Sequence, residues 1–181
     1  MSNTYKTRYE VQKIISDCIK KGISLYIKED GWGVMEFAQA SFISANKIVL
    51  INPIRVKRLG WQGQKYVYNS NGLSRVDEII EEQHWQIHTI LKKSDNPTIE
   101  DRQADDIASV LVSWFNGPGC DELRKHGVAN TRIDANQIIV YNDDSELYQK
   151  RAVFTVKIQV PKELSIPEVE MAAIKPKLMP I

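Results

Sequence analysis

Two histidines four residues apart, His84 and His88, are the first residues in this sequence whose type and spacing suggest chemistry. Imidazole nitrogens bind zinc, but bonds near ~2 Å to one ion require both rings to lie close together. Residues 83–93 alternate between apolar and polar side chains, which predicts a strand. On a strand, two residues four positions apart are separated by about 13 Å. We therefore expect no metal site at these histidines. We interpret them as part of a polar sheet face or of a contact between subunits, and a pH-sensitive contact is a hypothesis.

The other groups that could do chemistry do not form a recognisable site. Cys120 and His126 flank a short predicted helix, but no second pair of ligands completes a zinc site. Asp105-Asp106 are adjacent on a predicted helix and point about 100° apart, whereas Asp143-Asp144 belong to a predicted turn. The sequence contains no phosphate-binding loop, nucleophile elbow or zinc-protease motif. We predict no catalytic residue, cofactor or metal, and a protein that is not an enzyme.

Composition excludes several further classes. The 24 Lys and Arg residues balance 23 Asp and Glu residues, giving a net charge of +1, so the overall charge favours neither nucleic acid nor membrane. The apolar run at residues 48–51 is far shorter than the roughly 20 residues of a membrane span. With two cysteines and no secretion signal at its start, the chain is expected to be soluble and to fold in a reducing cytoplasm.

One segment combines cations with aromatic residues and is the strongest candidate for a binding surface. Around a predicted hairpin tip at residues 60–63 lie Arg55, Lys57, Arg58, Trp61, Lys65, Tyr66 and Tyr68. Such a mixture can contact DNA or an acidic protein groove, and Trp, Tyr and Arg are enriched in protein interfaces. A solvated hairpin and a partner-binding hairpin both fit the pattern. The acidic residues between 77 and 82 are interpreted as a solvated face.

The remaining patterns predict an α+β fold. Apolar stripes at helical spacing predict helices over residues 4–21, closed by Gly22, and after Thr98 to about residue 116, followed by a short amphipathic turn at 120–126. Strands are expected at residues 23–28, 47–51, 54–59, 64–68, 83–93, 132–141 and 151–160. The expected architecture is a two-layer sandwich: a mainly antiparallel sheet covered on one face by two helices, with a long β-hairpin and an extended C-terminal arm.

The C-terminal arm defines the predicted domain organisation. Residues 151–160 alternate regularly, and Pro161 is expected to end that strand. Residues 161–181 contain several prolines and no periodicity, so we predict one domain over residues 1–160 and an extended arm over 161–181. As a hypothesis, residues 164–181 become ordered only on contact with a neighbouring subunit.

Several short runs resemble proteins of the phage neck or tail-terminator family. They are Gly60-Trp61-Gln62-Gly63, Trp85-Gln86-Ile87-His88, Trp114-Phe115-Asn116-Gly117-Pro118-Gly119-Cys120 and the run from Tyr148 through Gln149, Lys150 and Arg151 to Val156. The resemblance covers about residues 32–160. It implies a homohexameric ring at the virion neck that caps the tail tube, contacts the sheath if the tail is contractile, and docks onto head-completion proteins. Genomic DNA would pass through the lumen without sequence-specific binding, and no membrane or cofactor is implied.

The sequence therefore favours a structural virion protein. The surfaces we predict for contacts are Arg55, Lys57, Arg58, Trp61, Lys65, Tyr66, His84, His88, Pro161, Leu164 and Ile166. The alternatives are a head-completion adaptor, another tail subunit, or a small DNA-binding module acting through the hairpin between Arg55 and Tyr68.

Overall fold

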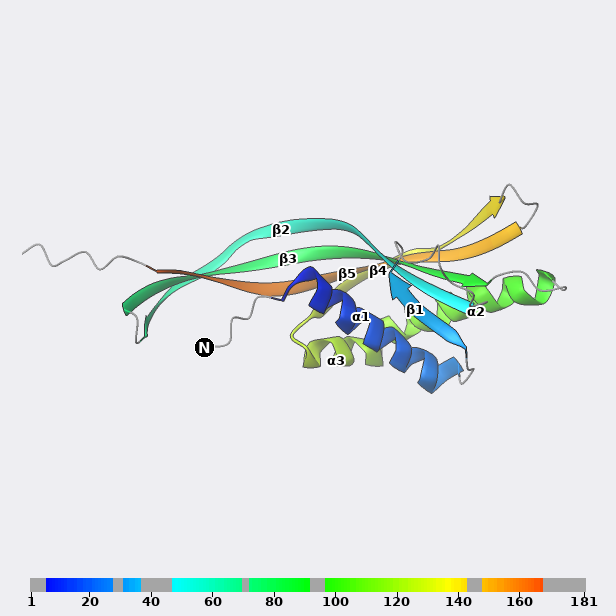
Figure 1. Cartoon of the computed structure of the whole chain (residues 1–181), viewed down its shortest axis with the longest axis horizontal. Coiled ribbons are helices and arrows are strands. Elements are labelled where there is room, and N and C mark those ends of the chain that lie inside the picture. The colour runs from blue at the N-terminus through cyan, green and yellow to red at the C-terminus, as the bar shows by residue number, and fades with distance from the viewer. Residues whose placement is uncertain are drawn as a thin grey trace, which may run out of the picture.

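The structure is a computed structural model that describes residues 6–27, 31–36, 47–69, 72–91, 97–142 and 148–167. Within these residues a five-stranded sheet carries its helices on one face (Figure 1). In chain order the elements are α1 (Arg8–Gly22), the π-helical turn η1 (Ile23–Ile27), β1 (Trp32–Glu36), β2 (Lys47–Asn69), β3 (Gly72–Leu91), α2 (Pro97–Asn116), α3 (Pro118–Lys125), β4 (Ala129–Asn142) and β5 (Tyr148–Pro167). The predicted α+β class is confirmed.

The sheet has the strand order β1-β2-β3-β5-β4. β1 pairs with β2 in parallel, while β2 with β3, β3 with β5 and β4 with β5 are antiparallel, so the sheet is mainly antiparallel, as predicted. β2, β3 and β5 are the long central strands, and β1 and β4 cover only part of the outer edges of β2 and β5. No described helix is long and apolar enough to cross a membrane.

Helix α1 begins with a capping box at Thr7 and Glu10. The Thr7 hydroxyl accepts from the Glu10 backbone N–H at 3.2 Å, and the Glu10 carboxylate accepts from the Thr7 N–H at 2.7 Å. The predicted apolar stripe is buried through Val11, Ile15, Cys18 and Ile19. The helix therefore lies where the periodicity placed it, although it starts at Arg8 rather than at residue 4.

Gly22 does not act as the predicted C-terminal cap. It lies inside the helix, and its backbone is not among those with positive φ. A Cβ at this position would lie 2.9 Å from Cδ1 of Trp114, whose indole N–H donates to the Cys18 carbonyl at 3.0 Å. Gly22 thus makes room for the close approach of α2 to α1, which a single-sequence pattern does not reveal.

The strand predicted at residues 23–28 is wrong. Residues 23–27 continue the helix as a π-helical turn, in which the Ile23 N–H donates to the carbonyls of Ile19 and Lys20. Ile23 is buried and Ile27 packs against the same core. Their spacing of four residues fits one helical face, so tertiary packing overrides the β-propensity of this apolar run.

The predicted hairpin tip at residues 60–63 is also wrong, because β2 is one strand of 23 residues. Its pairing with β3 shifts register between Arg58 and Trp61 and again between Trp61 and Gly63, and Gly60 has φ +101°. The glycines therefore belong to bulges, which insert extra residues without reversing the chain. The reversal comes later, where Asn69 pairs with Gly72.

Pro161 does not end the last strand, because β5 continues to Pro167 and pairs with β3 throughout. Proline is tolerated in a strand that has one unpaired side, and β4 pairs with β5 only as far as Gln159. Leu164 and Ile166 pair with Asp77 and Arg75 in their own chain, so the first residues of the predicted arm belong to the sheet. Residues 168–181 lie outside the described residues, and for them the arm stays a prediction.

The core lies between the sheet and the helices. Its largest fully buried side chains include Trp85, Phe154, Phe115 and Leu111. Helix α2 begins at Pro97, one residue before the predicted cap Thr98, and Gly117 separates it from α3.

An ion pair joins α1 to α3. Lys21 of α1 pairs with Glu122 of α3 at 2.8 Å, and hydrogen bonds from Lys21 and Lys125 lower the pKa of Glu122 to about 2.

Candidate interaction surface

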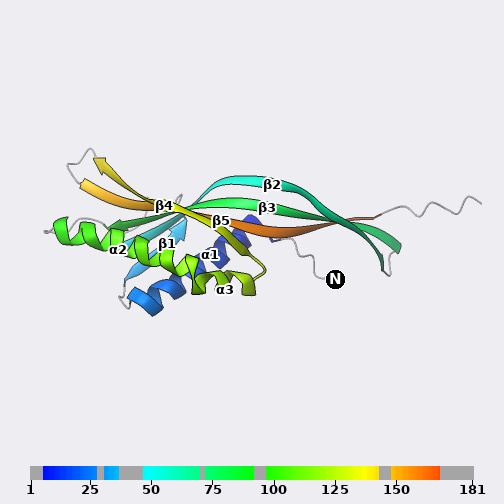
Figure 2. The ribbon, with the colours of Figure 1, turned by 180° about the vertical axis from the view of Figure 1, so that it is seen from behind.

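The most distinctive part of the molecule is the end of the sheet that extends beyond the helices (Figures 1 and 2). We call it the blade and define it as residues 56–69 of β2, 72–83 of β3 and 158–167 of β5, which share register rows from Val56, Gln83 and Ile158 onward. Both views show these three strands running on past α1 and α3. The blade contains or adjoins ten of the eleven predicted contact residues.

The cations and aromatic side chains that were predicted to form one cluster lie on two opposite faces of the blade. On β3 the odd-numbered residues, such as Trp85, point into the helix-covered core, and cross-strand partners share a face. Arg58 pairs with Glu81 and Tyr66 with Arg75, on the helix side of the sheet. Partners on the opposite face are Arg55 with His84, Lys57 with Glu82 and Lys65 with Val76. The backbone of Trp61 pairs with Ile79, and nothing further is described for its side chain.

Acidic residues of the same chain neutralise much of the basic charge. Glu78 and Glu163 are direct cross-strand neighbours, and the Lys65 ammonium lies 2.8 Å from a carboxylate oxygen of each. Hydrogen bonds to Glu163 and Glu78 raise the pKa of Lys65. Lys65 thus holds the three strands together near the blade tip, where two adjacent carboxylates would otherwise repel each other.

A second ion-pair cluster lies closer to the helices. Glu81 is 7 % exposed, and its carboxylate lies 2.6 Å from Lys162 Nζ and 4.0 Å from Arg58 Nε. The interpretation of the acidic run as a solvated face is therefore wrong for Glu81. Because Lys65, Arg58 and Lys162 are all paired internally, less charge is left to contact DNA phosphates than the sequence suggested.

The two histidines have different environments. His84 Nε2 lies 2.8 Å from Glu82 Oε1, and this hydrogen bond lowers the pKa of Glu82. His88 is 5 % exposed and pairs with Gln86 at 3.1 Å. Burial, with a smaller effect of Arg151, lowers the pKa of His88 to about 4. His88 therefore does not reach the surface at which we predicted a contact. Among the described side chains, no group of three or more His, Cys, Asp or Glu could hold a metal ion.

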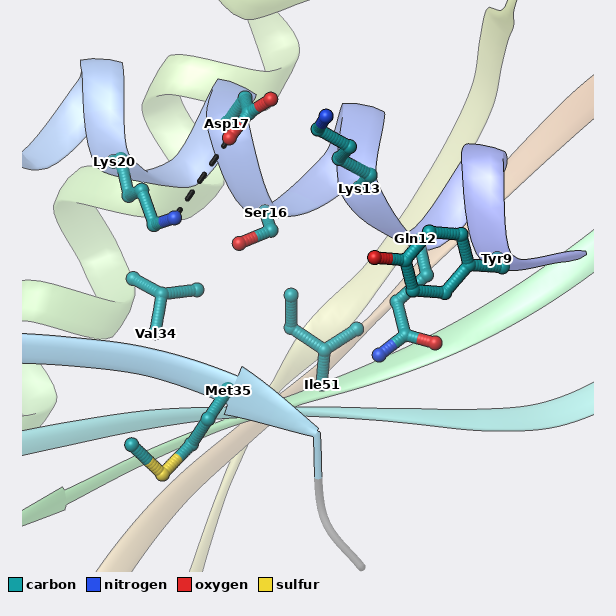
Figure 3. Close-up of a pocket in the computed structure, with 9 residues that line it drawn as sticks. All are labelled: Tyr9, Gln12, Lys13, Ser16, Asp17, Lys20, Val34, Met35 and Ile51. Atoms are coloured by element: carbon teal, nitrogen blue, oxygen red, sulfur yellow. Dashed lines mark ion pairs between the residues drawn. The ribbon is translucent and has the colours of Figure 1, made fainter. Parts of the chain in front are cut away.

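Two pockets that the sequence did not reveal lie where the outer strands end. The first, about 320 Å³, lies between α1 and the ends of β1 and β2. Figure 3 shows Gln12 and Ser16 of α1 pointing toward the sheet, Ile51 and Val34 pointing back toward the helix, and Tyr9 at one end. The floor is apolar and the rim is polar, a combination typical of pockets that bind a small molecule or an apolar side chain of a partner.

The second pocket, about 300 Å³, lies where β4 begins beside β5. Ile80, Val128 and Pro161 supply apolar walls, and Arg124 at the end of α3 adds one cation. Of the predicted contact residues, only Pro161 lines it. No local sequence pattern predicts this pocket, because its walls come from β3, β5 and the segment after α3.

Residues 10–166 match the family model described as E217 gateway protein gp29. The chain belongs to this family. The E217 gateway protein gp29 family is a phage neck or connector family with a structural role in joining head and tail. No curated protein matches the sequence.

Family membership confirms the phage neck resemblance at the level of the family. Gateway proteins are structural phage proteins that are not known as enzymes, and they interact with other head and tail proteins. In a protein of this kind, the surfaces that contact neighbours are the functional site. The blade and the two pockets are therefore the candidates.

Proposed function

We propose that this gateway-family chain forms a closed homohexameric ring at the phage neck that ends growth of the tail tube and joins the tail to head-completion proteins. The observation that carries the proposal is the match of residues 10–166 to a head–tail gateway family. In the finished virion the ring surrounds the genomic DNA without sequence-specific contacts, and the protein resides in the neck.

The surface of the blade supports assembly with neighbours. Three large apolar side chains of the blade are about half exposed or more, namely Val56, Tyr66 and Tyr68, and Ile54 lies just before it on β2. Apolar side chains gathered in one region of a surface are typical of protein interaction sites. In a cyclic ring each subunit offers two different surfaces to its neighbours, so one elongated element can contact the next subunit.

The charge distribution supports a lumen that lets DNA pass. The net charge is +1, and Lys65 and Lys162 of the blade are paired with carboxylates of the same chain. A weakly charged surface neither binds duplex DNA tightly nor repels it strongly. Binding to duplex DNA that falls steeply with added salt would instead support a DNA-binding module.

The sharpest test uses phage in which the gene is silenced. If the chain ends tube growth, infected cells should accumulate tails of uncontrolled length beside DNA-filled heads, as seen by electron microscopy, and supplying the intact gene should restore virions. Tails of normal length that merely fail to join heads would contradict tail termination and leave a connector role. Normal virions would contradict both.

A second test measures the oligomeric state of the purified chain by native mass spectrometry over a range of concentrations. A discrete ring is expected, with a fixed number of subunits. An open series of growing polymers would contradict a closed ring, because only a closed cyclic contact limits subunit number.

A further inference from the structure

The blade has two outer strand edges that no strand covers within the described part of the chain. β1 pairs only with Lys47–Ile51 of β2, so the outer edge of β2 is uncovered over residues 52–69. β4 pairs with β5 as far as Gln159, so the outer edge of β5 is uncovered over residues 160–167. Uncovered edges present backbone donors and acceptors that can pair with another chain.

Both edges contain features that limit where a strand can add. On β2, register shifts follow Pro53 and Arg58 and end at Gly63, beyond which residues 63–69 pair regularly with β3. On β5, Pro161 and Pro167 flank residues 162–166, which pair regularly with β3 as well. Bulges and prolines discourage edge pairing, so one regular stretch is left on each side of the blade.

The two regular stretches, residues 63–69 of β2 and 162–166 of β5, share register rows of the sheet and run in the same direction. Gln64 and Leu164 both pair with Asp77, and Tyr66 and Ile166 both pair with Arg75, from opposite sides of β3. β2 and β5 are both antiparallel to β3, so they run in the same direction. A rotation about a ring axis can therefore bring the β2 edge of one copy beside the β5 edge of the next.

Charge favours this pairing over a symmetric contact between two β2 edges. β2 carries Lys47, Arg55, Lys57, Arg58 and Lys65 and no acidic residue. A symmetric contact between residues 63–69 of two copies would bring two Lys65 ammonium groups together beside their carboxylate partners, which is a weak repulsion. The regular stretch of β5 contains one cation, Lys162, and one anion, Glu163, and so imposes no such repulsion.

The second pocket supports the same arrangement. It lies at the foot of the uncovered β5 edge, between Gln159, Pro161 and the residues after α3. In the paired arrangement β2 of the neighbouring copy runs along the β5 edge beside this apolar pocket.

We propose that residues 63–69 of β2 in one copy pair in parallel with residues 162–166 of β5 in the next copy, so that the sheet continues from subunit to subunit. This inference rests on the ring proposed above and specifies the contact that closes it. The alternative is that a strand from a different protein pairs with these edges, and cysteine cross-linking distinguishes the two cases.

Cysteine cross-linking tests the contact in the intact chain. In a background with Cys120→Ser, Tyr66→Cys and Ile166→Cys, which share the register row of Arg75 and therefore one face, are made separately, mixed, and oxidised mildly at a concentration where native mass spectrometry shows the oligomer. Within one copy these positions are separated by β3, at roughly 10 Å, beyond the reach of a disulfide. Edge pairing holds the thiols at an effective concentration on the order of mM, so the mixture should give at least about tenfold more linked dimer than a control.

The matched control replaces Tyr66→Cys with Arg55→Cys, which lies on the same edge at the first bulge. Linked dimer from Tyr66→Cys alone would overturn the proposal in favour of a symmetric contact. A ring that forms while the mixture gives no more dimer than the control would overturn the edge contact and leave the ring intact, pointing to another protein as the occupant. Absence of any oligomer would overturn both.

Discussion

The three long central strands, β2, β3 and β5, are stabilised in two different ways along their length. Beside the helices, β3 and β5 bury Trp85 and Phe154 in an apolar core. In the blade, ion pairs centred on Lys65 and Glu81 join the strands, and large apolar side chains of β2 remain exposed. Helix cover stabilises the body, by which we mean the helices together with residues 47–55 of β2, 84–91 of β3 and 148–157 of β5. In the blade, ion pairs hold the strands together while its apolar residues stay available to neighbours.

The largest expected contrast comes from removing one aromatic side chain from each region. Phe154 is 1 % exposed and its ring lies 6.4 Å from that of Phe115. Phe154→Ala should lower the free energy of unfolding by about 3–5 kcal/mol, because it leaves a cavity. Tyr68 is 71 % exposed, so Tyr68→Ala should change it by less than about 0.5 kcal/mol. Urea denaturation of the isolated chain measures both, and equal losses would contradict the comparison.

The next largest effect depends on pH and belongs to the body. His88 is buried with its pKa lowered to about 4 from 6.5, so its unfolded form binds a proton more readily than its folded form. Stability is therefore fully present above pH 6.5 and falls as the pH drops toward 4, by on the order of 3 kcal/mol from this residue. His88→Gln should abolish the part of this acid-induced loss of unfolding free energy that comes from His88. Urea denaturation at pH 7 and at pH 4.5 measures it.

His84→Gln is the control, because it leaves His88 and its neighbour Arg151 in place. This variant should lose stability in acid as the unchanged chain does. If His88→Gln falls as steeply as the unchanged chain, other groups govern the acid sensitivity of the body.

The body could be predicted from the sequence to a larger extent than the blade. The apolar stripe of α1 and the alternation of residues 151–160 are local signals, and both lie within the elements that they predicted. The Gly60–Gly63 run fits a turn or a bulge equally well by local criteria. The choice depends on pairing with β3, which follows later in the chain.

The same limitation applies to the candidate contact residues. The sequence grouped Arg55, Lys57, Arg58 and Tyr66 on one hairpin, but the bulges and the alternation of side chains distribute them over two faces. A one-residue change of register moves a side chain to the other face. The ion pairs that neutralise Lys65 come from two other strands, so no local pattern could reveal them.

An intermediate effect is expected where the blade joins the body. Glu81→Gln removes the carboxylate that lies beside Lys162 and Arg58, and should cost about 1–3 kcal/mol because Lys162 is largely buried. Glu82→Gln, at a more exposed neighbouring position, should cost less than about 0.5 kcal/mol. Hydrogen exchange of the β3 amides would show whether the loss is confined to the blade. Equal effects of the two variants would mean that ion pairs do not hold its strands together.

The smallest effect tests the bulge in β2. Gly60 has φ +101°, a conformation that alanine adopts at a cost of roughly 1 kcal/mol. Gly63 does not have positive φ, and a Cβ there would lie 3.4 Å from Glu78 Oε2, an ordinary contact. Gly60→Ala should therefore destabilise the chain measurably, while Gly63→Ala should not, in the same urea experiment. Equal tolerance of both would indicate that residues 60–63 are not constrained as a bulge. The edge of β2 would then accept a strand from Arg55 onward rather than only beyond Gly63.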